Sequence, residues 1–194
     1  MYLSKIKVLS ASFGKATPYP HLVLPHFFRE DKIGAICKAL LKESFTLKEA
    51  DLFKFWQTQD LVGTRNKLLQ EFRTFLCSAE FVQFMCEITL ASLRKGVVDM
   101  AGTKYTDTHY LLPHDDQLEG RKIAYFLYLS DLKKNEGGRL QLFDSYNSRP
   151  STVKAEIIPT SGTFAFFLVS NKSFHQVEEV IRRQRLAISG WFHD

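Results

Sequence analysis

The sequence predicts an α+β fold that is mostly β: a jelly roll, or double-stranded β-helix, preceded by supporting helices. Apolar residues recur at helical spacing in the first half of the chain, and after Gly96 they change to short alternating or continuous runs. Glycine, proline, asparagine and serine separate these runs, as is typical of a β-sandwich or barrel. The 17 phenylalanines also favour a β-rich core with aromatic packing.

The first half of the chain predicts three helices, over residues 29–43, 65–77 and 81–88. We expect their apolar stripes to pack against a sheet, because an amphipathic helix buries its apolar face. Residues 1–28 contain three prolines around Leu22-Val23-Leu24 and predict an extended segment with one short strand. Residues 47–63 mix aromatic and polar side chains and predict a loop or an irregular hairpin.

The second half predicts a series of strands. The strands are expected over residues 97–100, 108–113, 123–129, 139–143, 153–158, 163–169, 174–180 and 186–192. The run at 123–129 is continuously apolar, which indicates a strand covered on both faces. At 194 residues the chain can bury one good core, so we expect one domain over 1–194, with helical support over about 1–95 and the jelly-roll core over about 96–194.

The composition argues against several classes of protein. The three cysteines, Cys37, Cys77 and Cys86, form no Cys-x-x-Cys pair, so we expect neither a disulfide framework nor a zinc site. We find no signal peptide and no membrane-spanning apolar run, and therefore expect a reducing cytoplasmic or nuclear location. The net charge of +5 comes from scattered residues, so we predict no direct nucleic-acid or membrane binding. The oligomeric state stays open.

Three residues indicate a metal site. One residue separates His114 from Asp116, and alternate side chains of an extended segment share a face, so both can reach one ion. His175, in the predicted strand 174–180, can supply a second imidazole. Two imidazoles and one carboxylate are the ligand set of non-haem Fe(II) oxygenases, which leave positions open for a co-substrate and dioxygen. By itself His-x-Asp is a weak motif, and a surface turn with a hydrogen-bonded strand histidine explains these residues equally well.

The order of His114, Asp116, His175 and Arg185 resembles that of the 2-oxoglutarate-dependent prolyl hydroxylases. The segments 119–129 and 185–192 resemble the same superfamily. Within it, residues 114–121, 173–177 and 185–193, and more weakly 51–55, resemble the ribosomal prolyl hydroxylases of eukaryotes. The resemblance implies hydroxylation of a proline of a small-subunit ribosomal protein at ring carbon 3, with release of succinate and CO2. Members in larger eukaryotes carry a second, non-catalytic jelly roll, and this sequence ends at Asp194.

The resemblance also implies Fe(II), 2-oxoglutarate, dioxygen and ascorbate as cofactors and co-substrates. The two histidines and the aspartate would hold the iron, and Arg185 would pair with the C5 carboxylate of 2-oxoglutarate, where a planar guanidinium gives a bidentate grip. Tyr128 and Tyr105 are implied to contact the co-substrate, although a core tyrosine explains Tyr128 equally well without the resemblance. Arg183 is an alternative cation, but only Arg185 directly precedes Leu-Ala-Ile-Ser-Gly-Trp.

Other functions stay open. The enzyme could act on another protein, or on nucleic acid as a demethylase. Demethylases of this fold carry a second arginine six residues after the first, where Trp191 stands here as an expected core or pocket-wall residue. A cupin-like module could bind metal without turnover, but it would not need Arg185. We expect Phe55 and Trp56 to form part of a lid over a peptide, and His109 to lie on the surface or behind the metal ligands.

Overall fold

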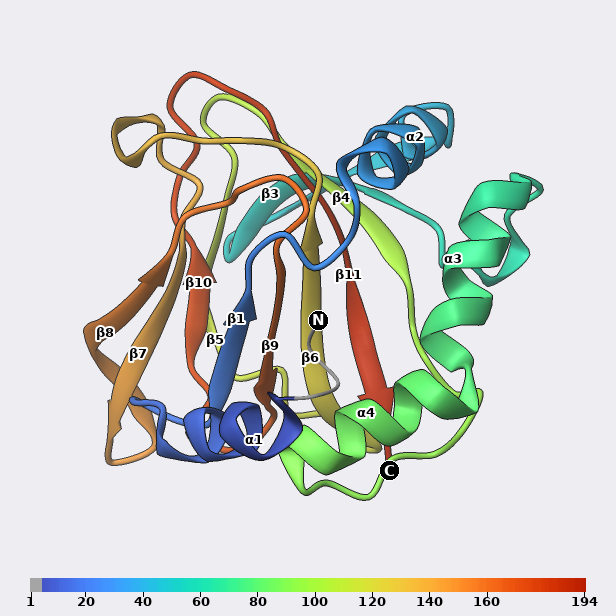
Figure 1. Cartoon of the computed structure of the whole chain (residues 1–194). Coiled ribbons are helices and arrows are strands. Elements are labelled where there is room, and N and C mark those ends of the chain that lie inside the picture. Colours follow the sequence, from blue (N-terminus) through green and yellow to red (C-terminus); the bar gives the residue numbers. More distant parts are fainter. Residues whose placement is uncertain (1–4) are drawn as a thin grey trace.

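In the computed structural model, which describes residues 5–194, eleven strands form one antiparallel sheet that curls into a nearly closed barrel (Figure 1). The strands are β1 (His21–Leu24), β2 (Phe45–Ala50), β3 (Phe53–Thr58), β4 (Ala101–Tyr105), β5 (Tyr110–His114), β6 (Arg121–Tyr128), β7 (Leu140–Tyr146), β8 (Arg149–Ile157), β9 (Phe164–Leu168), β10 (His175–Val177) and β11 (Arg185–His193). The α-helices of the same residues are α1 (Ile6–Lys15), α2 (Glu30–Leu40), α3 (Lys67–Cys77) and α4 (Ala79–Thr89). The predicted fold, mostly β with a few helices, is confirmed.

The order of the strands makes two parts of the sheet face each other. This order is β1-β9-β6-β11-β4-β3-β5-β10-β7-β8, and β2 pairs with the free edge of β3. The larger part is β1-β9-β6-β11-β4 and the smaller part is β5-β10-β7-β8. β3 joins them, because Trp56 and Gln57 pair with β4 whereas Phe53 and Lys54 pair with β5. Residues of β3, β4, β5, β6, β10 and β11 line a cavity between them.

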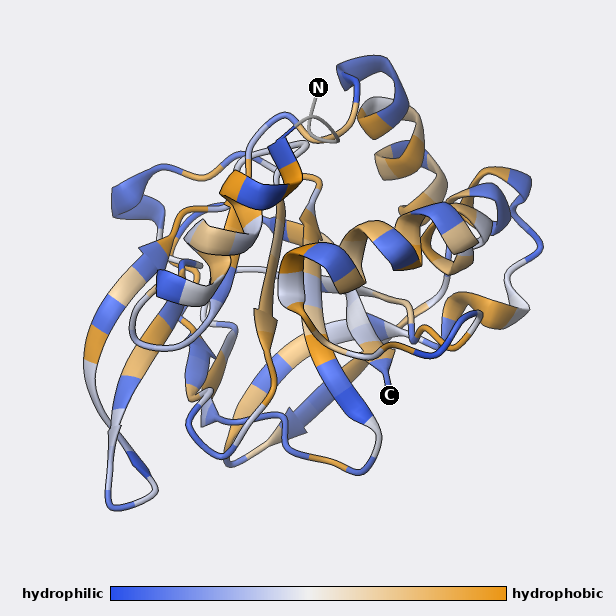
Figure 2. Ribbon diagram, turned by 60° about the horizontal axis from the view of Figure 1, so that its bottom comes forward, coloured by the Kyte–Doolittle hydropathy of each residue, from blue (hydrophilic) through white to orange (hydrophobic). Residues whose placement is uncertain are grey.

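The helices pack on the outer side of the larger part of the sheet (Figure 1). One apolar cluster contains buried side chains from all four helices and from the strands beneath them, among them Phe13, Leu40, Phe72, Ile88 and Ile188. Hydrophobic residues dominate the central strands, whereas hydrophobic and hydrophilic residues alternate along the helices (Figure 2). The main core therefore lies behind the strands, which leaves their inner side to line the cavity.

The three predicted helices are confirmed, as α2, α3 and α4. The segment 1–28 was expected to be extended, and its described part instead contains α1 before β1. Ile6, Leu9 and Phe13 of α1 lie at helical spacing and pack against the main core, and α1 also packs against α4. Residues 45–58 form a regular hairpin, β2–β3, where a loop or an irregular hairpin was predicted. The division of the chain at about residue 95 stays a prediction.

The described helices include none with the length and apolar content that crossing a membrane requires.

Two glycines provide a test of this packing. A Cβ at Gly190 in β11 would lie 1.9 Å from the carbonyl oxygen of Asp99, whereas a Cβ at Gly34 in α2 would meet nothing within 4 Å. We expect Gly190→Ala to lower the free energy of unfolding by about 3 kcal/mol, because backbone must move to make room. Gly34→Ala should raise it by about 0.5–1 kcal/mol, since alanine favours a helix over glycine. Urea denaturation measures both, and equal stability of the two variants would contradict the close approach at Gly190.

Candidate active site

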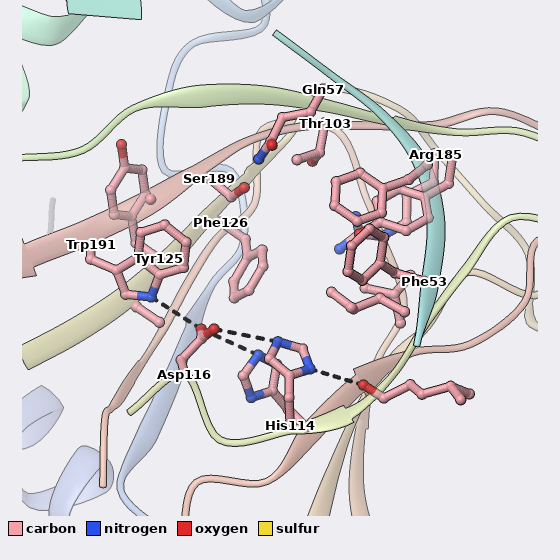
Figure 3. A pocket seen from close by; sticks show the side chains of 18 of the residues that line it. Phe53, Gln57, Thr103, His114, Asp116, Tyr125, Phe126, Arg185, Ser189 and Trp191 are labelled. Carbon is pink, nitrogen blue, oxygen red and sulfur yellow. Dashed lines mark hydrogen bonds and ion pairs between the residues drawn. The ribbon is translucent and has the colours of Figure 1, made fainter. Parts of the chain in front are cut away.

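The fold brings His114, Asp116 and His175 together at one end of the cavity (Figure 3). β5 and β10 are antiparallel neighbours with His175 directly opposite His114, and the centroids of the two rings are 4.1 Å apart. The Asp116 carboxylate lies 3.3 Å from Nε2 of His114 and 3.4 Å from Nε2 of His175. One donor atom from each residue lies within 4.8 Å of the other two.

Asp116 reaches the histidines by a different route from the one expected. The sequence suggested that strand alternation would place His114 and Asp116 on one face. The structure instead ends β5 at His114, and Asp116 follows with a φ of 61°, in the left-handed region. This turn in the backbone directs the carboxylate back toward both imidazoles.

Hydrogen bonds to backbone carbonyls orient both imidazoles. Nδ1 of His114 lies 2.9 Å from the carbonyl oxygen of Leu112, and Nδ1 of His175 lies 2.9 Å from that of Ser173. Because a carbonyl oxygen only accepts hydrogen bonds, each Nδ1 must carry the proton. The neutral form of each ring then presents the lone pair of Nε2 toward the carboxylate, which is how metal-binding histidines are oriented.

The charges at this cluster also suit a cation. Burial by itself raises the pKa of Asp116, but the interactions with His175 and His114 outweigh burial and hold this pKa well below its usual range. Burial lowers the pKa of His175, and the neighbouring His114 lowers it further. Burial also acts to lower the pKa of His114, but the interaction with Asp116 outweighs it and the pKa is raised. At neutral pH the cluster therefore contains an anionic carboxylate beside the neutral imidazole of His175.

Two further residues fix the Asp116 carboxylate, and sequence reasoning missed both contacts. The indole Nε1 of Trp191 donates a hydrogen bond to Oδ2 of Asp116 over 3.0 Å. The guanidinium of Arg121 stacks on the Trp191 ring at 3.4 Å from its centroid, with Nη1 3.9 Å from Oδ1 of Asp116. Trp191 was expected to be a core or pocket-wall residue, and it lines the cavity while also orienting the carboxylate.

Arg185 lines the same cavity and is 1% exposed. Its Nε and Nη2 atoms have no hydrogen-bond partner among the described residues, and neither has the Tyr128 hydroxyl. The guanidinium carbon lies 5.0 Å from the centroid of the Tyr105 ring and 5.2 Å from that of Tyr128. A buried cation without a counter-ion is unfavourable, so this arrangement fits an anionic ligand.

Both tyrosines are suited to donate hydrogen bonds to such an anion. Burial raises the pKa of Tyr105 and of Tyr128, against the opposing effect of the Arg185 charge, so both phenols stay protonated at neutral pH. Tyr105 lies opposite Arg185 in the β4–β11 ladder and lines the cavity. Tyr128, on β6, is not among the lining residues, and its ring faces the Arg185 guanidinium. The fold thus places all three residues in one cluster.

The cavity has a volume of about 320 Å³ and extends from the histidine cluster to Arg185. Its walls are mainly apolar: Phe53 and Phe126 (Figure 3) contribute to them, and so do Phe55, Leu111 and Val177. This volume lies at the lower end of the range of small-molecule sites, and the lining has the usual pattern of apolar walls with a few placed polar groups.

The expected lid residues lie on opposite faces of β3. Phe55 lines the cavity and stacks on Tyr105, with ring centroids 4.9 Å apart. Trp56 points to the other face, where the Lys104 ammonium lies 5.4 Å from its ring centroid. Phe55 is therefore a wall residue in a regular strand, and Trp56 is not among the lining residues.

The structure places two other residues of the sequence analysis away from the cluster. Arg183 is exposed and forms an ion pair with Glu136 over 3.2 Å, so it does not compete with Arg185. His109 is buried in the loop before β5, with its ring 3.5 Å from the Thr106 hydroxyl, and does not lie on the surface. Burial lowers the pKa of His109.

Comparisons with known proteins identify the family and the fold of this chain. Residues 100–193 match the model of the 2OG-Fe(II) oxygenase superfamily. The prolyl 3-hydroxylase OGFOD1 of Xenopus laevis is 37% identical over 92% of this chain and 35% of its own length. The prolyl 3,4-dihydroxylase OGFOD1 of Ostreococcus tauri is 35% identical over 91% of this chain and 38% of its own length. The chain thus spans about a third of the length of these relatives.

A solved structure confirms the fold. The crystal structure of a Pseudomonas putida prolyl-4-hydroxylase matches with a TM-score of 0.75 at 18% identity, and the match covers 95% of this chain and 98% of that one. At this identity the likeness shows the fold alone, which is the predicted jelly roll. The family match spans all six residues that the sequence analysis placed at the site, from Tyr105 to Arg185. Residues 100–193 of this chain therefore form a domain of the 2OG-Fe(II) oxygenase superfamily.

Proposed function

We propose that this chain is an Fe(II)- and 2-oxoglutarate-dependent prolyl hydroxylase whose substrate is a proline of a small-subunit ribosomal protein. The observation that carries the proposal is a buried, unpaired guanidinium in the same cavity as a His-Asp-His cluster. The cluster fits a divalent metal, and the guanidinium fits the far carboxylate of a dicarboxylate. The relatives named prolyl 3-hydroxylase and prolyl 3,4-dihydroxylase support the choice of proline.

His114, Asp116 and His175 would hold the iron. Their donor set, two neutral imidazoles and one carboxylate, leaves coordination positions open for other ligands. Iron held by these residues would supply the activation of dioxygen, coupled to oxidative decarboxylation of 2-oxoglutarate to succinate and CO2. The chain's own share is to orient the ligands: backbone carbonyls hold the two imidazole rings, and Trp191 and Arg121 hold the carboxylate.

Arg185 would bind the C5 carboxylate of 2-oxoglutarate, with Tyr128 and Tyr105 as further contacts. The Nε and Nη2 atoms that lack partners give the parallel donors that a carboxylate accepts in a bidentate pair. The Tyr128 hydroxyl, also without a partner among the described residues, can donate to the same group. The bound carboxylate would compensate the buried charge of Arg185, and the apolar walls would exclude water from the reacting atoms.

The substrate would enter beside the apolar walls. Phe53, Leu111 and Phe126 are suited to pack against the faces of a proline ring, which is apolar except at its backbone atoms. A ribosomal protein as the substrate rests on the sequence resemblance, and so do ascorbate as a reductant for the iron and a cytoplasmic or nuclear location. A hydroxylase of another protein, a demethylase and a metal-binding module without turnover are the competing functions, and the third test below separates them.

Removal of a proposed iron ligand tests the metal site. His114→Ala and Asp116→Ala should each weaken the binding of Mn²⁺, used as a redox-stable substitute for Fe(II), by more than about 100-fold. Loss of a residue that only orients a ligand typically weakens metal binding by about 10- to 100-fold, and loss of the ligand itself should weaken it more. Calorimetric titration of the metal-free protein measures this. His26→Ala, which removes an exposed histidine, is the control and should bind as the parent does. Unchanged affinity in either ligand variant would reassign the site.

Replacement of Arg185 tests the co-substrate site. Arg185→Ala should raise the 2-oxoglutarate concentration needed for half-maximal succinate formation by roughly 100-fold, since a desolvated charge-assisted pair contributes about 3 kcal/mol. The ligand-free variant should be no less stable than the parent, because the substitution removes an unpaired buried charge. Arg183→Ala should leave the requirement unchanged, as its side chain is exposed and paired with Glu136. Equal effects of the two substitutions would argue against this role for Arg185.

Mass spectrometry tests the reaction and the substrate together. The protein is incubated with the decoding-centre protein of the small ribosomal subunit, Fe(II), 2-oxoglutarate and ascorbate. We expect one added oxygen on a proline, which should be absent with His175→Ala. Succinate formation without an added oxygen would keep the oxygenase assignment and discard this substrate, leaving another protein or a nucleic acid. Metal binding without succinate formation would instead favour a module without turnover.

A further inference from the structure

Three polar side chains interrupt the apolar walls of the cavity. They are Gln57 on β3, Thr103 on β4 and Ser189 on β11. Gln57 pairs with Thr103 across β3 and β4, and Thr103 pairs with Ala187, two residues before Ser189, across β4 and β11. They therefore lie next to one another on one wall, across the cavity from His114 and Asp116 (Figure 3).

This polar wall has unused hydrogen-bonding capacity. Thr103 donates to the carbonyl oxygen of Ala187 over a long 3.5 Å. Within residues 5–194, neither the Gln57 amide nor the Ser189 hydroxyl makes an intramolecular hydrogen bond. The roles proposed for metal and co-substrate use neither group. Both side chains are half-buried in the wall of the cavity, where their donors and acceptors are free to bind a ligand, so this wall is suited to a polar ligand group.

The chain presents Gln57 to the cavity through the alternation of β3. Phe53, Phe55 and Gln57 face inward, whereas Lys54 and Trp56 face the opposite side. An apolar side chain at the third inward position would continue the wall, but the sequence has an uncharged amide there. A primary amide has both donors and an acceptor at one planar end. It therefore matches a group that also offers one donor and one acceptor side by side.

We propose that Gln57, with Ser189 beside it, binds the backbone N–H and C=O of the residue that precedes the target proline in a peptide substrate. This inference rests on the proposed function. Proline itself has no N–H to offer. The residue before a proline is confined to extended conformations, in which its N–H and C=O point to the same side, as they do in a strand ladder. That pair complements the end of the Gln57 side chain, and Ser189 can donate a further hydrogen bond to the carbonyl.

The subsite gives the enzyme a means to select peptide-bound proline without reading side chains. The recognised atoms belong to the backbone, and Gln57 has no charge, so neither a basic nor an acidic neighbour is required. Free proline lacks the preceding residue and cannot occupy this subsite. Hydroxylation would therefore be confined to proline within a chain.

The test combines substitutions of Gln57 in the protein with removal of the recognised N–H from the peptide. The peptide carries the target proline and a fluorescent label, and its binding is measured by anisotropy to the full chain loaded with Zn²⁺ and 2-oxoglutarate, which do not react. Gln57→Leu should weaken binding about tenfold, as expected for the loss of two hydrogen bonds. Gln57→Glu, which keeps the shape but loses the donor, should also weaken it. Gln59→Leu, at an exposed position just beyond the same strand, is the matched control.

N-methylation of the residue before the proline removes its N–H from the peptide. Together with Gln57→Leu it forms a double-mutant cycle. In the parent protein it should weaken binding by less than Gln57→Leu does, because it removes one of the two hydrogen bonds. In Gln57→Leu it should have at most about a twofold effect, because that hydrogen bond is already absent. N-methylation of the residue after the proline should act equally on both proteins.

The outcomes separate the two proposals. Additive effects of N-methylation and Gln57→Leu, or unchanged binding in Gln57→Leu, would overturn the subsite while leaving the hydroxylase function intact. A parent protein that binds no prolyl peptide and hydroxylates none would overturn both.

Discussion

The site depends above all on the antiparallel pairing of β5 with β10. This ladder sets His175 directly opposite His114, and the left-handed turn at Asp116 then brings the carboxylate to both rings. A shift of one residue in the register would turn His175 to the other face of the sheet, because side chains alternate along a strand. The ladder is irregular between His175 and Val177, as is common where a sheet directs side chains into an active site.

The second constraint is the buried charge of Arg185, which destabilises the fold, whereas the β5–β10 pairing is part of it. Its burial without a counter-ion works against folding, and it is tolerated because the rings of Tyr105 and Tyr128 flank the guanidinium. Such a locally unfavourable feature is expected at functional sites rather than in a core built only for stability. The ligand that satisfies Arg185 would therefore also stabilise the fold, since binding to the native state alone shifts the unfolding equilibrium.

The two sides of the larger part of the sheet have separate tasks. Its outer side packs against the helices and forms the main core, which includes Leu40, Ile88 and Ile188. Its inner side, freed from much of that packing, presents Arg185, Ser189 and Trp191 from a single strand, β11, to the cavity. One strand can serve both tasks because its side chains alternate between the faces. The chemistry of the cavity can thus depend on a few polar residues without weakening the helix-to-sheet core.

The sequence by itself determined what is local: the helices α2, α3 and α4, the residue types of the candidate cluster, and the strands of the second half apart from β4. The predicted strand over 97–100 was wrong, and β4 follows it at Ala101–Tyr105. Hydrophobic periodicity carries this information within a few turns or a few residues. The tertiary structure alone decided the position of Trp56 on the far side of β3 and the hydrogen bond from Trp191 to Asp116, whose residues are 75 positions apart. Contacts between distant segments leave no local pattern, because the closure of the sheet determines them and not the spacing along the chain.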